Sequence, residues 1–497
     1  MGVQVRSGMR IQFLPKPHVP ALARFLLFHP RRSRGQGLPG LILIGLVMIG
    51  LPLLPAGCGG GDHPRGYPWA DRPNLVLVVV DTLRQDHLQP YGYDPGYANS
   101  PHLQALAAES VTVEGMIGVS SWTLPSMATL FTGMTPQQHE VMRLPAGDAR
   151  MRARSRLPQT ETLAGSLQKH GYATSCVQSN WLLMKNRGTR FQQGFDAYLE
   201  VDLELDENGA PAPHRGSTAD QVVDLGLQWL EQRKDSKPWF MTLHFFEPHS
   251  SYEDHSEVRF LDPTYQGWVQ GGLPNREYRK WQEKSNEADR RQLRSLYDEE
   301  IWKMDQALGR LLEQLRRRDD WDRTLFVFTT DHGEELAERG YIGHTQTLHF
   351  EQVDLPLMVR FPGALHGGSR RQAYFSQQHL FATLLDFCGA PEVSGRGRSQ
   401  AAWLVEETAG LPKEPVPMEV DFIPILREHR EKYVRKRAVL KSPYKYVLDL
   451  MSGEEQLFFL PEDPGERNNL AQDPNHAATL EQLRTWVENH SWWQGEE

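Results

Sequence analysis

Two short runs of apolar and β-branched residues stand out along the chain, and an acidic residue follows each of them directly. Residues 75–80 lead into Asp81, and residues 325–330 lead into Asp331. Continuous runs of this kind are typical of strands that are buried on both faces of a parallel sheet. Parallel strands end at one edge of the sheet, and ligands of α/β proteins bind at that edge. The pattern therefore predicts an α/β fold with its site at this edge.

Helical periodicity fills the intervals between the two runs. A helix is predicted to begin at residues 100–101, with Ser100 as its N-terminal cap. Between residues 285 and 318, leucine, isoleucine and methionine recur every three or four positions, which predicts a long amphipathic helix. The polar stretch 250–284 predicts an irregular insertion at the rim of the pocket. Its aromatic residues could stack on a sugar or aryl group or simply pack in the core: Tyr252, Tyr265, Trp268, Tyr278 and Trp281.

The pattern changes beyond residue 391. Residues 441–450 and 456–460 predict short strands, and residues 477–490 predict a final helix. The sequence therefore predicts a larger α/β domain over residues 72–391 and a small C-terminal α+β subdomain over residues 392–497.

The first 61 residues differ from the rest in charge, with seven basic residues and no acidic one. An arginine-rich stretch, 31–34, precedes the apolar run 38–54, and Cys58 follows two small residues. This order predicts export, either by a lipoprotein signal cut before Cys58 or by an uncleaved membrane-spanning anchor. Both interpretations place the body of the protein outside the cytoplasm, tethered to a membrane, in the periplasm or at the cell surface.

Composition excludes two other classes of protein. The formal net charge of the whole chain is −9, which argues against a nucleic-acid partner. Besides Cys58, only Cys176 and Cys388 are present, so the fold is not a disulfide framework. Whether these two cysteines pair stays open at this point.

The segment 120–133 carries the first sign of chemistry. Pro125 suits the first turn of a helix, which places Thr123 at the helix N-terminus among free backbone N–H groups. The Thr123 hydroxyl could cap the helix or act as a nucleophile. Asp81, Asp331 and His332 favour the nucleophile, because they can hold a divalent cation that lowers the pKa of the hydroxyl.

With these residues in place, the sequence resembles the sulfatase family of the alkaline phosphatase superfamily. The resemblance spans about residues 73 to 472, and its main motifs lie at 74–84, 124–133, 330–334, 343–344 and 463–470. It implies a large mixed, mostly parallel β-sheet flanked by helices, with the small C-terminal subdomain completing the fold. It also makes residues 72–391 the catalytic domain.

The resemblance also implies a role for single residues. It makes three of them metal ligands: Asp81, Asp331 and His332. Thr123 stands in the nucleophile position, where it would bridge metal and substrate. His249 matches a histidine that contacts the ester or its leaving group, and His344 stands where the family binds the anionic oxygens. Three further histidines are candidates for outer positions or for a second metal: His87, His244 and His349.

Three departures from the family pattern change the expected chemistry. Sulfatases convert a Cys or Ser at the nucleophile position to formylglycine, and Thr123 cannot be converted. A Thr phosphate has a direct hydrolytic route, so Thr123 favours phosphorus esters over sulfate esters. Thr82 replaces a carboxylate ligand, which favours Zn²⁺ or Mn²⁺ over Ca²⁺ or Mg²⁺. Met127 replaces an Arg, which removes a cation from the site.

The sequence therefore predicts an exported, membrane-tethered, metal-dependent hydrolase of sulfuric, phosphoric or phosphonic esters, with phosphorus esters favoured. The organic part of the substrate could be a glycan or a lipid headgroup. Two alternatives stay open: a transferase that moves a phosphoryl group to a lipid or glycan, and a non-catalytic lipoprotein that binds sulfated or phosphorylated glycans. Metal content distinguishes the second alternative from the enzymes.

Overall fold

The computed structural model describes residues 63, 65–69, 72–145, 149–201, 218–255, 257–406, 409–423 and 433–492. The predicted export segment, residues 1–61, lies outside these ranges. Within them, every helix is too short or too polar to cross a bilayer. The described residues group into one compact unit.

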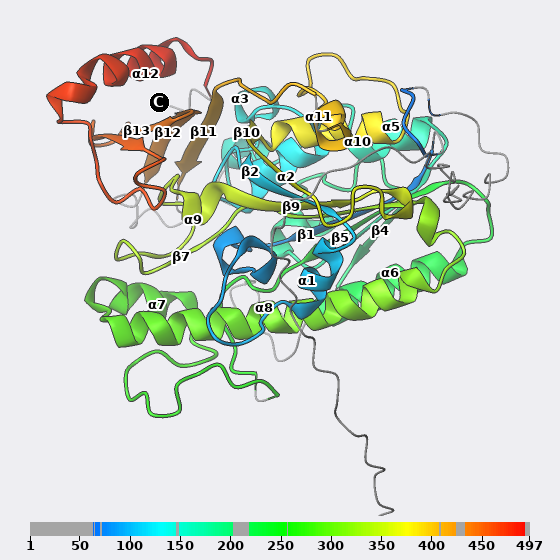
Figure 1. Cartoon of the computed structure of the whole chain (residues 1–497), viewed down its shortest axis with the longest axis horizontal. Helices are drawn as coiled ribbons and strands as arrows, with labels where there is room; N and C mark the ends of the chain where they lie inside the picture. The colour runs from blue at the N-terminus through cyan, green and yellow to red at the C-terminus, as the bar shows by residue number, and fades with distance from the viewer. Residues whose placement is uncertain are drawn as a thin grey trace, which may run out of the picture. The chain divides into compact units, whose positions relative to one another are not determined.

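An eight-stranded sheet forms the centre of this unit, in the order β10-β2-β9-β6-β1-β5-β3-β4 (Figure 1). Its strands are β1 (Asn74–Val80), β2 (Val111–Ile117), β3 (Ala173–Gln178), β4 (Ala197–Glu200), β5 (Trp239–Phe245), β6 (Thr324–Thr330), β9 (Asp354–Arg360) and β10 (Arg370–Ser376). All neighbouring pairs are parallel except the two that β9 makes, with β2 and with β6. The predicted mixed, mostly parallel sheet is confirmed.

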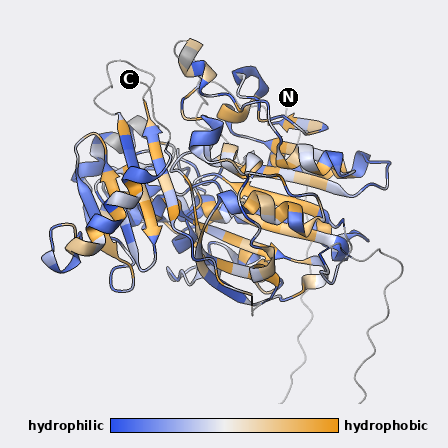
Figure 2. Ribbon diagram, turned by 90° about the horizontal axis from the view of Figure 1, so that it is seen from above, coloured by the Kyte–Doolittle hydropathy of each residue, from blue (hydrophilic) through white to orange (hydrophobic). Residues whose placement is uncertain are grey.

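Six helices cover the two faces of this sheet. One face carries α2 (Thr123–Thr132), α5 (Leu163–Lys169) and α10 (Gln378–Phe387), and the other carries α1 (Pro101–Ala107), α6 (Thr218–Gln232) and α8 (Glu287–Arg316). Successive residues of β1 point to opposite faces, so Leu77 and Val79 join one core while Val76 and Val78 join the other. This double burial explains the continuous apolar run, and Figure 2 shows the apolar strands enclosed between helices with polar outer faces.

The long helix α8 and the shorter α1 illustrate what local pattern can and cannot predict. The expected helix over residues 285–318 is present as Glu287–Arg316. Ser100 precedes α1 but its side chain does not cap the helix. Asp305 of α8 takes that place, accepting hydrogen bonds from the backbone N–H groups of His102 at 2.9 Å and Leu103 at 2.8 Å. The predicted Ser100 cap is therefore wrong, because a buried carboxylate from another helix satisfies the same donors.

A second, antiparallel sheet forms the C-terminal subdomain. Its strands are β11 (Val416–Phe422), β12 (Val434–Lys441), β13 (Tyr444–Asp449) and β14 (Glu455–Phe459), and α12 (Ala477–Asn489) packs against it. The predicted strand over 441–450 is split, because Ser442 and Pro443 form the turn between β12 and β13, and proline lacks the N–H that pairing requires. The small subdomain itself is confirmed.

The remaining α-helices and strands of the described chain are short. They are α3 (Pro136–His139), α4 (Ala149–Ala153), α7 (Asn275–Trp281), α9 (Phe350–Val353), α11 (Ala401–Val405) and the two-stranded sheet of β7 (Glu335–Leu336) and β8 (Ile342–Gly343). Apart from α7 and one 3-10 turn, the described part of the insertion 250–284 is irregular, as predicted. Its Tyr252 and Tyr278 are fully buried in the core, so these two pack rather than present their rings to a ligand.

The two cysteines of the body do not pair. Cys176 lies in β3 and Cys388 follows α10, and both are buried free thiols. Burial raises the pKa of each thiol, so both behave as inert core residues.

Candidate active site

The two predicted carboxylates meet at the carboxyl edge of the main sheet. Val80 of β1 pairs with Thr330 of β6, so Asp81 and Asp331 leave neighbouring parallel strands side by side. Both are fully buried. The Asn180 side chain, which follows β3, donates a hydrogen bond to Asp81 Oδ2 at 2.6 Å. The sheet therefore delivers two carboxylates to one point, and an asparagine that follows β3, two strands away from β1, fixes the first of them.

His332 directs its Nε2 atom toward three oxygens. Its Nδ1–H donates to the carbonyl oxygen of Gly333 at 2.9 Å, which leaves the lone pair on Nε2. Nε2 lies 3.6 Å from Asp81 Oδ1, 3.5 Å from Asp331 Oδ2 and 3.4 Å from the hydroxyl oxygen of Thr123. The structure thus brings all four predicted metal and nucleophile residues to one place.

Thr123 enters this cluster as the first residue of α2. Trp122 occupies the N-cap position, and no side chain there caps the helix. The Thr123 side chain is 2% exposed and contacts His332 instead of the helix end. The helix-capping interpretation of this hydroxyl is therefore wrong, and the hydroxyl is available at the positive end of the helix.

His244 joins the cluster more closely than the sequence predicted. It lies in β5, opposite Val79 of β1, and its Nε2 atom is 4.0 Å from Asp81 Oδ2. One ligand atom each from Asp81, His244 and Asp331 lies within 4.8 Å of the others. Burial and the nearby His332 ring lower the pKa of His244 to about 3, so the imidazole is neutral. The one feature of the sequence that pointed to His244 was a polar residue near the end of an otherwise apolar strand.

The donor set of this cluster fits a divalent cation. Asp81 Oδ1, Asp331 Oδ2 and His244 Nε2 are buried and have no hydrogen-bond partner among the described residues. Burial and the charge of Asp331 raise the pKa of Asp81 well above its ordinary value. Buried carboxylates of like charge are costly unless a cation compensates them. Carboxylate oxygens and imidazole nitrogens are ligands that such a cation accepts.

His249 and His344 extend the cluster away from the carboxylates. The ring centres of His332 and His344 are 4.6 Å apart, and those of His344 and His249 are 5.1 Å apart. His249 donates from Nδ1 to the carbonyl oxygen of Ser250 at 2.6 Å. Burial and the His344 ring lower the pKa of His249 to about 4, so this imidazole is also neutral. Three imidazoles therefore form a row that ends at the carboxylates.

A buried glutamate holds the middle imidazole of this row. Glu334 Oε1 lies 3.0 Å from His344 Nδ1, and Glu334 Oε2 accepts a hydrogen bond from the Tyr252 hydroxyl at 2.6 Å. Glu334 follows the motif residues Asp331 and His332 by only a few positions, but its partners lie elsewhere in the chain. The sequence had therefore given no role to Glu334 or Asn180, and it had offered Tyr252 only as a ring that stacks on a substrate or packs in the core.

Two of the three additional histidines lie in other contacts. His87 Nδ1 is 2.8 Å from Asp298 Oδ1, and His349 Nδ1 is 3.5 Å from Glu466 Oε2. Of the predicted outer candidates, only His244 belongs to the described group that could hold a metal ion. Met127, which replaces the family's Arg, is fully buried in the core beneath α2 and adds no charge to the cluster.

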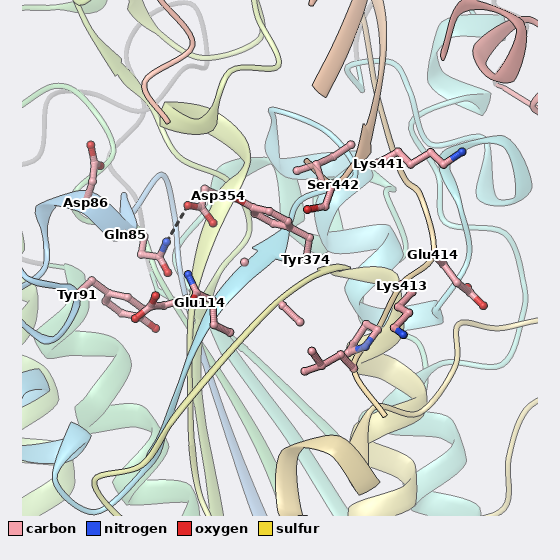
Figure 3. Close-up of a pocket in the computed structure, with 16 residues that line it drawn as sticks. Gln85, Asp86, Tyr91, Glu114, Asp354, Tyr374, Lys413, Glu414, Lys441 and Ser442 are labelled. Carbon is pink, nitrogen blue, oxygen red and sulfur yellow. Dashed lines mark hydrogen bonds between the residues drawn. The ribbon is translucent and has the colours of Figure 1, made fainter. Parts of the chain in front are cut away.

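A separate cavity of about 730 Å³ opens between the main sheet and the C-terminal sheet (Figure 3). Gln85, Glu114, Asp354 and Tyr374 line it on the side of the main sheet, and Lys441 lines it on the other. On the side of the main sheet, the Gln85 side chain donates to Asp354 Oδ2 at 2.8 Å. None of the six predicted site residues lines it. We therefore do not assign the ester substrate to this cavity.

A mixed α/β sheet with acidic and histidine side chains at its carboxyl edge is typical of the metal-dependent hydrolases of the alkaline phosphatase superfamily. The family model described as Sulfatase matches residues 73–390. The chain therefore belongs to the sulfatase family and is an ester hydrolase, as its motifs predicted.

The proteins and structures that this chain resembles carry different names. An arylsulfatase of Clostridium perfringens is 23% identical over 477 residues, which cover 83% of this chain and 93% of that protein. The phosphonate monoester hydrolase of Silicibacter pomeroyi has a TM-score of 0.65 at 21% identity, over 84% of this chain and 95% of that one. A protein solved with its substrate D-glucosamine-2-N,6-O-disulfate has a TM-score of 0.66 at 20% identity. The match covers 84% of this chain and 97% of that one.

Proposed function

We propose that Thr123 is the nucleophile of a metal-dependent hydrolase that acts on anionic esters and prefers phosphorus esters. One observation carries this proposal: the Thr123 hydroxyl oxygen lies 3.4 Å from His332 Nε2, buried at the head of α2 beside the paired carboxylates. A hydroxyl without a base or a cation nearby is a weak nucleophile. The residues needed to activate this hydroxyl surround it.

Four residues would hold the cation: Asp81, His244, Asp331 and His332. Two of them offer nitrogen, which favours Zn²⁺ or Mn²⁺ over Ca²⁺ or Mg²⁺. When bound, the cation would lower the pKa of the Thr123 hydroxyl and stabilise negative charge on the ester oxygens. Asn180 would orient Asp81, and the carbonyl of Gly333 would hold His332 in the tautomer that presents Nε2.

The preference for phosphorus follows from the chemistry of threonine. Threonine is a secondary alcohol and cannot become the aldehyde by which formylglycine sulfatases release sulfate. Attack by the Thr123 oxygen on phosphorus would form a Thr phosphoester and break the bond from phosphorus to the alcohol. Water would then attack the same phosphorus, break its bond to Thr123 and restore the hydroxyl. The names of the relatives include both sulfur and phosphorus chemistry, so the family fold accommodates either.

His249 and His344 would act on the substrate side of the reaction. Because His249 is neutral and carries its proton on Nδ1, its Nε2 atom can accept a proton from the attacking water. His344, held by Glu334, would contact the ester's anionic oxygens. The organic part of the substrate would be a glycan or a lipid headgroup, and a glycan agrees with the sulfated glucosamine bound by one structural relative.

The test compares wild-type protein with Thr123→Ala on an aryl sulfate, a phosphate monoester, a phosphodiester and a phosphonate ester. Each is assayed after chelation and after resupply of Zn²⁺, Mn²⁺ or Ca²⁺. We expect metal-dependent turnover of a phosphorus ester that falls by about 10³-fold or more in the variant, since removal of a nucleophile has effects of this size. Thr129→Ala is the matched control, because it removes another buried hydroxyl from the same helix.

The outcomes separate the two parts of the proposal. Turnover of the aryl sulfate alone, abolished by Thr123→Ala, would retain Thr123 as the nucleophile and overturn the preference for phosphorus. Turnover that survives Thr123→Ala would overturn the nucleophile. Protein without a stoichiometric divalent metal and without turnover would favour the binding lipoprotein.

We also propose that the enzyme is exported and tethered to a membrane, through a lipid on Cys58 or through the apolar run before it. The basic stretch, the apolar run and the small residues before Cys58 support this proposal. Globomycin, which blocks lipoprotein signal cleavage, distinguishes the two forms. A shift in the mass of the mature protein indicates the lipoprotein, and an unchanged mass indicates the anchor.

A further inference from the structure

A second cavity, of about 580 Å³, lies at the edge of the main sheet opposite to the candidate active site. Three connections that enter parallel strands at their amino ends line it: residues 72–74 before β1, 233–239 before β5 and 318–323 before β6. Asp81 and Asp331 follow the carboxyl ends of β1 and β6. The length of the strands therefore separates this cavity from the catalytic cluster.

Positive charge predominates around this cavity although the chain as a whole is acidic. Five basic residues line it: Arg72, Arg233, Lys237, Arg318 and Arg323. The acidic residues that line it are three: Glu231, Asp235 and Asp320. Asp320 already accepts hydrogen bonds from Arg318 at 2.9 Å and from the Trp239 ring N–H at 3.2 Å. Lys237 and Arg323 form no ion pair within the described ranges, so the cavity keeps uncompensated positive charge.

Arg233 is the buried member of this basic group. Its side chain is 10% exposed, and its Nη2 atom donates to Asp235 at 2.7 Å and to the carbonyl oxygen of Lys237 at 2.8 Å. Its Nη1 atom is buried and has no acceptor among the described residues. Burial and the charge of Arg318 lower the pKa of Arg233. A buried guanidinium N–H without an acceptor is costly, and a ligand that supplies one removes the cost.

We propose that this cavity binds a tetrahedral oxyanion, a phosphate or sulfate group, through Arg233 with Lys237, Arg318 and Arg323. The planar donors of arginine match the oxygens of such a group, and the lysine adds a point charge. The group could be a free anion or the headgroup of a phospholipid. The predicted membrane segment precedes Arg72 in the sequence, which makes a headgroup a relevant source.

The first test measures binding of inorganic phosphate to the full chain in detergent by isothermal titration calorimetry. We expect a binding event that weakens about tenfold or more in Arg233→Gln, since each charge-assisted hydrogen bond contributes roughly this factor. Arg294→Gln, an arginine on α8 that does not line the cavity, is the matched control and should bind as wild type. Turnover and its inhibition by phosphate, which report the catalytic cluster, should not change in either variant.

Two further variants guard against a folding defect. Arg233→Lys retains the charge but loses the planar donors, and Lys237→Gln alters an exposed side chain. Both should weaken phosphate binding while the unfolding temperature without phosphate stays at the wild-type value. Phosphate binding that is identical in wild type and in all three cavity variants would overturn the proposal, as would wild-type protein that binds phosphate only at the catalytic cluster.

The second test identifies the source of the oxyanion with vesicles of phosphatidylcholine, with or without phosphatidylglycerol. Wild type and Arg233→Gln share the same N-terminal segment, so a difference between them reports the cavity. Stronger retention of wild type on phosphatidylglycerol vesicles, absent in the variant, would identify a lipid headgroup. Equal retention together with unequal phosphate binding would identify a free oxyanion.

Discussion

At the scale of single residues, the site depends on how each imidazole is held. His332 donates from Nδ1 to a backbone carbonyl, so its Nε2 atom faces Asp81, Asp331 and Thr123. His244 is fully buried among β-strands, and its ring nitrogens have no hydrogen-bond partner in the described ranges. Burial keeps this imidazole neutral, and the neutral form is the one that binds a metal cation.

His244→Ala therefore tests the extent of the metal site. We expect the affinity for Zn²⁺ or Mn²⁺ to fall by about 10 to 100-fold or more, since even the loss of a residue that only supports a metal ligand has an effect of this size. Metal content after gel filtration, measured by mass spectrometry, checks this. His476→Ala, in the C-terminal subdomain, is the control. An unchanged metal content in His244→Ala would restrict the site to the three ligands predicted from the sequence.

At the scale of elements, α2 positions the nucleophile because it is buried along its whole length. All ten of its residues are buried, and its first residue is Thr123. Gly133 ends the helix in the left-handed region, at φ +65°, where its N–H bonds to the carbonyl oxygen of Thr129. A side chain there would meet the Phe381 ring of α10 at 2.7 Å. The two ends of α2 are thus fixed by the active site and by a packed glycine.

Gly133→Ala should destabilise the protein by about 2 to 4 kcal/mol, because it adds a steric clash to the cost of a positive φ. Gly395→Ala is the matched control, since its φ is +76° and no atom lies within 4 Å of the added carbon. The control should cost only about 1 kcal/mol. Urea unfolding measures both changes in the free energy of unfolding. Equal changes would show that the Phe381 ring of α10 moves aside without an energetic cost.

At the scale of the whole molecule, a buried ion pair within the C-terminal subdomain lies against the start of α9. Lys445 of β13 and Glu466 are both fully buried, and Lys445 Nζ lies 2.7 Å from Glu466 Oε1. Glu466 also accepts a hydrogen bond from the backbone N–H of Phe350, at the start of α9. The family tail motif around residues 463–470 therefore has a structural role, which is to anchor the subdomain.

Acid should weaken this anchor. Burial alone would raise the pKa of Glu466, but the adjacent Lys445 ammonium outweighs it and holds the pKa well below the ordinary value of 4.5. A carboxylate with a depressed pKa adds stability above its unfolded pKa, and that stability is lost as the pH falls through the folded pKa. The free energy of unfolding of the wild type should therefore fall steadily as the pH is lowered below about 4.5.

Lys445→Met provides the companion measurement. It leaves Glu466 buried without its cation, which should destabilise the protein by about 3 to 5 kcal/mol at pH 7 and reduce the acid dependence. Lys441→Met, on an exposed residue at the end of β12, should change stability by no more than about 0.5 kcal/mol. Urea unfolding at several pH values measures both effects. An unchanged acid slope in Lys445→Met would assign the acid lability to other carboxylates.

Within the described ranges, the elements with the strongest local patterns are those that the sequence determined. The apolar runs of β1 and β6, the periodicity of α8 and the strand pattern after residue 391 each follow from burial on known faces. Because parallel strands end together, the same patterns placed Asp81 and Asp331 at one edge. Pro125 located the start of α2 and with it Thr123. Each of these inferences rests either on residues close together in the sequence or on the parallel direction of the strands.

Tertiary structure alone decided the contacts that join distant segments. Asn180 reaches Asp81 across 99 residues, Tyr252 reaches Glu334 across 82, and Asp305 replaces Ser100 as the cap of α1 across about 200. A histidine in a sequence is equally suited to a metal, a carboxylate or the core. His244 became a candidate ligand, and His87 and His349 did not, because strand order and packing determine which groups share a buried space. The sequence specified the chemical groups, and the fold determined their partners.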